Sequence, residues 1–204
     1  MSERKTEIVR PTGEAGQVKR CIRRMLSRFR RSQDGAAAVE FGFVALPFLM
    51  LLWAIFETAL MFWTNQVLEE SLSQASRSVL TGQSRSLYNS NNAATNATAF
   101  RDAVCARAPL GLIDCSKLSI DVRSYGDFGA ASAGTSNSNP IAGGKLDTSS
   151  FSYSQPASGQ IVVIRAVLDY QLFLTSWASA SLANIGTGRR GLVASIAFRA
   201  EPFV

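Results

Sequence analysis

A long apolar stretch in the first third of the chain limits the structures that the protein can adopt. Residues 36–63 number 28, and among them only Glu40, Glu57 and Thr58 carry a charged or hydroxyl side chain. About 20 apolar residues of helix are enough to cross the hydrocarbon core of a bilayer. The central helix of a large soluble core can be equally apolar, but the length and the arginines ahead of the stretch favour a membrane. We expect a transmembrane segment at about residues 40–62.

The residues ahead of this stretch are basic. Residues 1–34 contain ten Lys and Arg against four Asp and Glu, and the other 170 residues contain eleven of each sign. Positive charge beside a span stays in the cytoplasm, which predicts a cytoplasmic leader at residues 1–35 and an outer domain at residues 83–204. A basic arm can also bind nucleic acid. Because the topology rule already explains this arm, we expect no nucleic-acid partner.

Glu40 lies at the start of the apolar stretch, where a carboxylate is costly unless it reaches water or has a partner. One interpretation is that it stays hydrated at the cytoplasmic surface. The other follows from its distance to Gly35. If a peptidase cut after Gly35, Ala36 would become a free α-amine and Glu40 would be the fifth residue of the mature chain. In an assembly of packed helices, the carboxylate of one subunit could neutralise the amine of its neighbour.

The segment from Gly35 to Phe41 reads GAAAVEF, and it is followed by ALPF at residues 45–48 and IFE at residues 55–57. Behind a basic leader, this pattern resembles the processing site of type IV prepilins, and it is similar to the TadE-like minor pilins, or pseudopilins, of the tight-adherence pilus. The resemblance implies cleavage between Gly35 and Ala36 by a prepilin peptidase, and roles for Glu40 and Phe41 in recognition and assembly. Major pilins of this system are shorter and usually have Tyr at the position of Phe41, which favours a minor subunit.

Apolar residues continue at helical intervals beyond the span, for example at Leu68 and Val79. We therefore predict one long helix over residues 36–82 that ends at Gly82. Pro47 removes a backbone hydrogen bond and is expected to kink the helix inside the membrane. Glu57 is expected to mark the outer boundary of the span.

The region after Gly82 is expected to form a small α+β head of about 120 residues, with one modest core. Its polar segment 83–98 and its Gly-, Ser- and Asn-rich segment 126–159 are typical of loops, the second with a possible short strand at residues 151–153. The sequence predicts strands at residues 118–125, 160–170 and 191–199 and helices at residues 97–108 and 176–184. The fold class is thus α+β, with a long N-terminal helix and a head that contains a short antiparallel sheet.

Cys105 and Cys115 are the two cysteines beyond the apolar stretch, and Cys21 precedes it. An oxidising compartment would favour a disulfide between Cys105 and Cys115, whereas two free thiols are the alternative. Two cysteines without any histidine make a metal site a poor expectation.

The absence of histidine also weighs against catalysis. No Ser-His-Asp, Cys-His or His-Glu-x-x-His arrangement is possible in this chain. The aspartates of the head are scattered without a recognisable motif, so we expect neither an enzyme nor a cofactor.

Two functions remain in view. The first is a prepilin-like structural or assembly component of a bacterial tight-adherence pilus. Such a subunit would lie in the inner membrane with its N-terminus in the cytoplasm and its head in the periplasm or in the pilus, in contact with the peptidase, other pilus subunits and the assembly machinery. The alternative is an unprocessed single-span membrane protein whose outer domain binds or scaffolds other proteins.

Overall fold

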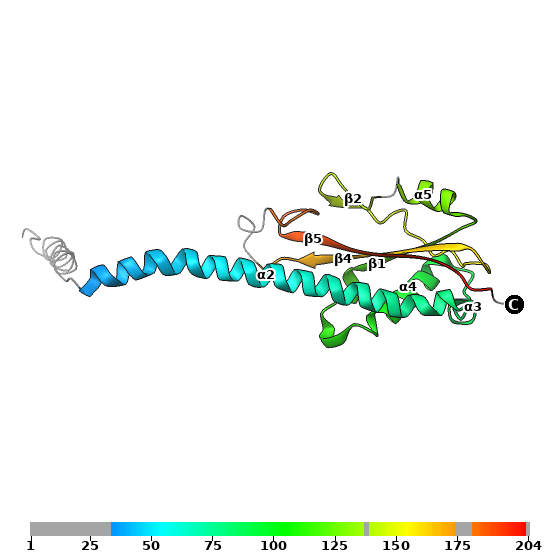
Figure 1. The fold of residues 1–204 in the computed structure, drawn as a ribbon, viewed down its shortest axis with the longest axis horizontal. Helices are drawn as coiled ribbons and strands as arrows, with labels where there is room; N and C mark the ends of the chain where they lie inside the picture. The colour runs from blue at the N-terminus through cyan, green and yellow to red at the C-terminus, as the bar shows by residue number, and fades with distance from the viewer. Residues whose placement is uncertain (1–33, 137–138, 174–180, 203–204) are drawn as a thin grey trace, which may run out of the picture. The chain divides into compact units, whose positions relative to one another are not determined.

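The computed structural model describes residues 34–136, 139–173 and 181–202. The chain divides into two compact units, one that ends at Leu52 and one that begins at Trp53. The fold is α+β, as predicted: a long apolar helix, α2 (Asp34–Leu80), is followed by a small domain with antiparallel sheets (Figure 1). The domain contains the helices α3 (Ser84–Leu87), α4 (Ala93–Cys105) and α5 (Phe128–Ser136), the 3-10 turns η1 (Pro109–Gly111) and η2 (Cys115–Lys117), and the strands β1 (Leu118–Tyr125), β2 (Ile141–Ala142), β3 (Lys145–Leu146), β4 (Ile161–Gln171) and β5 (Arg189–Arg199).

One stripe of α2 forms part of the core of this domain. Ten residues of the helix are buried at intervals of one, three or four, the spacing of one helical face: Glu57, Met61, Thr64, Val67, Leu68, Ser71, Leu72, Ala75, Ser76 and Val79. The residues between them are mostly exposed, including Glu69 and Glu70. The helix ends at Leu80, and Gly82 follows with a positive φ of 76°. A left-handed glycine is a common helix terminator, and the helix ends two residues before the Gly82 that the sequence indicated.

The main sheet has the strand order β1-β4-β5 and is antiparallel throughout. Its strands agree with the three that the sequence predicted, although β5 begins two residues earlier. Alternate residues of β4, such as Ile164 and Leu168, join the core that contains the α2 stripe. α2 and α4 lie on this face of the sheet, and α5 and β2 lie on the other (Figure 1).

Aromatic rings fill the core between α4 and the sheet. Phe100 is fully buried and contacts Tyr88 edge to face, with ring centroids 5.6 Å apart. Tyr153 packs against both rings. Burial raises the pKa of the Tyr153 hydroxyl well above its ordinary value.

The segment 83–98 is more ordered than predicted, because α3 and the first turn and a half of α4 lie within it. The side chain of Asn92 caps α4 by accepting a hydrogen bond from the amide of Ala94. Asn96 is buried and bonds the amide and the carbonyl of Ser90, which holds the preceding turn. The helix expected at residues 97–108 therefore starts at Ala93 and ends at Cys105.

The segment 126–159 is also not a plain loop. α5 occupies residues 128–136, and the Asp127 carboxylate accepts a hydrogen bond from the amide of Ala130 near its start. β2 and β3 form a two-residue hairpin through Gly143 and Gly144, both with positive φ, as tight hairpins require. The possible strand at residues 151–153 is reduced to a single parallel bridge between Tyr153 and Val122.

The helix expected at residues 176–184 falls largely outside the described residues. Residues 181–184 are described, and they form a turn and an irregular segment rather than a helix. The backbone at the end of this segment and just after it supports β5, since the amides of Asn184 and Ile185 donate to the carbonyl of Arg189.

The stripe of α2 can be tested by one substitution and one neighbouring control. Leu72→Ala should lower the free energy of unfolding by about 2–5 kcal/mol, because Leu72 is 1% exposed and its truncation leaves a cavity. Ser73→Ala, on the exposed side of the same turn, should change it by less than about 0.5 kcal/mol. Urea titration of the full chain in detergent, followed by near-ultraviolet circular dichroism, measures both. Equal midpoints for the two variants would contradict this packing.

Candidate functional site

The first half of α2 exposes large apolar side chains on every face. Phe41, Phe43 and Val44 are 70–80% exposed, and most positions from there to Phe56 are exposed as well. An 18-residue window of this helix has a mean hydropathy of 2.1 and none of it is buried. A helix that is apolar all round and uncovered has the length and composition of a membrane anchor.

The proposed processing residues lie at the start of the described part of α2. Ala36, Glu40 and Phe41 are exposed, and Gly35 is partly so. Ala36 and Glu40 are four residues apart and therefore share one face of the helix. Within the described ranges no side chain pairs with the Glu40 carboxylate. The cleavage site, the roles of Glu40 and Phe41 and the kink at Pro47 stay predictions, although Pro47 does lie inside α2.

Glu57 has a role that the sequence did not reveal. It was expected only to mark the end of the span, but it is 3% exposed and is the first residue of α2 that packs against the small domain. Its carboxylate accepts a hydrogen bond from the backbone amide of Phe173, just after β4. Burial, and to a smaller extent the nearby Glu57 charge, raise the pKa of Tyr170. The partner is 116 residues away in the chain, so no local pattern could have indicated it.

The two cysteines of the domain form a disulfide. Cys105 ends α4 and Cys115 begins η2, and their Cα atoms are 6.0 Å apart. Beside it, hydrogen bonds from the Ser116 side chain and amide lower the pKa of Asp114. A matching turn at Asp147 and Ser149 lowers the pKa of that carboxyl in the same way. Both acids serve as local turn caps.

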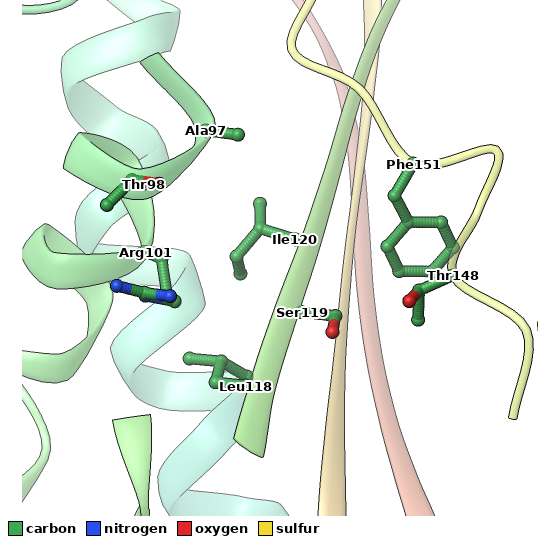
Figure 2. A pocket seen from close by; sticks show the side chains of 8 residues that line it. All are labelled: Ala97, Thr98, Arg101, Leu118, Ser119, Ile120, Thr148 and Phe151. Carbon is green, nitrogen blue, oxygen red and sulfur yellow. The ribbon is translucent and has the colours of Figure 1, made fainter. Parts of the chain in front are cut away.

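A hollow of about 200 Å³ lies between α4, β1 and the segment that precedes Tyr153 (Figure 2). Its walls include Ile120, Phe151 and Thr148, and Arg101 is the charged residue among the labelled side chains. Arg101 is paired with Asp102 on the surface of α4. Thr98, Ser119 and Thr148 bring hydroxyl groups to the hollow, but none of its eight lining residues is an acid, a histidine, a lysine or a cysteine that could act on them as a general base. In the described part of the chain, no three His, Cys, Asp or Glu side chains gather as metal ligands would.

Comparison with known proteins gives a match for one part of the chain, which lies within α2. Residues 35–77 match the family model described as TadE-like protein, which confirms the resemblance noted from the sequence. The match supports a membrane protein associated with Tad pilus systems, a structural rather than an enzymatic family. No curated protein and no solved structure matches the chain.

The disulfide should contribute measurably to the stability of the domain. It closes a loop with a sequence separation of 10, for which the chain-entropy model gives roughly 3 kcal/mol. Replacing Cys105 and Cys115 together by serine should therefore lower the free energy of unfolding by about that amount. Cys21→Ser is the control and should leave it unchanged. If the double substitution has no effect in non-reducing urea titrations, the disulfide is not a stabilising element.

Proposed function

We propose that the protein is a prepilin-like subunit, a structural or assembly component of a bacterial Tad pilus. The observation that carries the proposal is the division of α2 at Glu57. Before it the helix is apolar and uncovered on all faces, and after it one stripe packs into the core of a small domain. The family match runs along this same helix and includes Gly35 at its start. A helix that can exchange lipid for neighbouring helices while it carries a folded head suits a pilus subunit.

The proposed topology follows from charge. The ten basic residues ahead of the apolar stretch keep the N-terminus in the cytoplasm, and the head lies in the periplasm. The disulfide fits that assignment, since the periplasm is an oxidising compartment. A prepilin peptidase would meet the bond between Gly35 and Ala36 at the cytoplasmic edge of the inner membrane.

Assembly would then provide a cover for the exposed apolar side chains and a partner for Glu40. The exposed side chains between Phe41 and Leu52 present an apolar surface that neighbouring helices can cover without exposing it to water. Glu40 has no partner among the described residues. The α-amine that cleavage would create at Ala36 of a neighbour offers one, and pairing the two offsets the desolvation of both charges.

The cleavage step can be tested with two glycines of the same helix. Gly35→Val should leave a precursor that is 35 residues longer than the mature chain, because a cleft that threads the backbone closely has little room for a Cβ. Gly42→Val is the matched control and should be processed normally, since a Cβ at Gly42 meets nothing within 4 Å. Gel migration and N-terminal sequencing, in cells that possess the peptidase, give the answer. A wild-type chain that still begins at Met1 would favour the unprocessed single-span alternative.

Removing the charge of Glu40 should impair assembly and leave processing unchanged. Glu40→Gln keeps the volume and removes the charge, so the chain should be cut and inserted normally but should lose most of its crosslinking to other pilus subunits. If the site is well buried in the assembly, the unpaired amine costs roughly 3 kcal/mol.

Glu69→Gln is the control for this loss, because Glu69 is an exposed acid farther along the same helix. It should crosslink as the wild-type chain does. Normal crosslinking of Glu40→Gln would show that Glu40 only marks the water boundary.

A further inference from the structure

One end of the small domain carries an exposed aromatic residue next to Glu57 of α2. Phe173 is 75% exposed, and it follows directly after the buried Leu172 at the end of β4. Its ring meets Tyr170 edge to face at 6.4 Å between centroids. We call this part of the domain, made up of Glu57, Tyr170, Leu172 and Phe173, the proximal end.

The backbone of the proximal end is held in place. The amide of Leu172 donates to the carbonyl of Gly188, and the amide of Phe173 donates to the buried Glu57 carboxylate. A hydrogen bond to a charged, buried acceptor is stronger than one between neutral groups. Phe173 is therefore presented to the outside from a fixed backbone, although its side chain is apolar and uncovered.

Residue counts place this end at the edge of a bilayer. From Ala36 to Phe56 there are 21 residues, which is about the length that crosses the hydrocarbon core. The exposed surface of α2 stays uncharged beyond Glu57 and includes Phe62 and Trp63, which are 66% and 53% exposed. Trp63 is six residues past Glu57, a rise of about 9 Å, which is comparable to the headgroup layer. The first exposed charges of α2 after Glu40 are Glu69 and Glu70.

We propose that the proximal end rests in the headgroup layer of the membrane and that Phe173 is inserted there as a second anchor beside α2. The partner is the lipid surface itself. Aromatic side chains are favoured at this depth, where apolar and hydrated groups meet, and Trp63 and Phe173 would occupy it together. Glu57 acts as a positioning residue, because its carboxylate fixes the backbone that presents Phe173. The proposal depends on α2 spanning a membrane but not on cleavage or on assembly into a pilus.

Spin labels on the full, uncleaved chain in liposomes of zwitterionic lipid can test the proposal. The labels are placed one at a time by Phe173→Cys, Leu87→Cys and Leu49→Cys, in a chain with Cys21→Ser and the intact disulfide. Leu87 is the matched control, since it is an exposed apolar residue (57%) just beyond the other end of α2. It lies 30 residues after Glu57 and far from the proximal end. Leu49 reports on the apolar stretch itself.

Collisions with oxygen and with a water-soluble nickel complex measure the depth of each label. We expect the labels at residues 49 and 173 to collide less with the nickel complex and more with oxygen than the label at residue 87 does. If label 49 is shielded and label 173 is as open as label 87, the proximal end does not contact the membrane, and the anchor of the proposed function still stands. If label 49 is open as well, α2 does not span the bilayer, and both proposals fail.

Discussion

Burial of one stripe of α2 against the three-stranded sheet is the interaction on which the rest of the structure depends. The stripe supplies Leu68, Leu72 and Val79 to the core that also contains residues of the sheet and of α4. It also fixes the point along the helix at which one face becomes covered. Up to Phe56 no face of α2 is covered, and from Glu57 on one face lies in a protein core while the opposite face stays exposed. One continuous helix thus has an uncovered apolar part and a part that packs against a folded domain.

Much of this could be predicted from the sequence, because the signals are periodic. The 3.6-residue repeat of apolar residues beyond Trp63 indicated the buried stripe, Gly82 indicated its end, and β-branched residues indicated all three main strands. α5 and the early start of α4 were missed because each relies on a single capping side chain within a segment of loop-like composition. In α4 the buried Asn96 adds hydrogen bonds to the Ser90 backbone, and a polar residue in a polar segment gives no sign of that burial.

The two acids of the apolar stretch show where sequence reasoning is weakest. Glu40 and Glu57 have similar surroundings in the sequence, and the spacing to Gly35 drew attention to the first. In the structure Glu57 is buried within its own chain and bonds the amide of Phe173, whereas Glu40 is exposed. Carboxylates in apolar surroundings require partners. Glu57 has one internally, and the partner proposed for Glu40 comes from outside the chain. This difference separates a group that stabilises the fold from a group that is available for assembly.

The position of β5 along the chain has a consequence for how the protein is made. Arg189, where β5 begins, comes 110 residues after Val79, the end of the α2 stripe. The amide of Glu201, just past β5, closes the structure by donating to the carbonyl of Leu80. Contacts so distant in sequence form late, because ordering the intervening chain costs entropy before the contacts contribute any favourable free energy. Nearly the whole domain must therefore be available before its core can close, and until then the apolar residues of the α2 stripe lack their native partners.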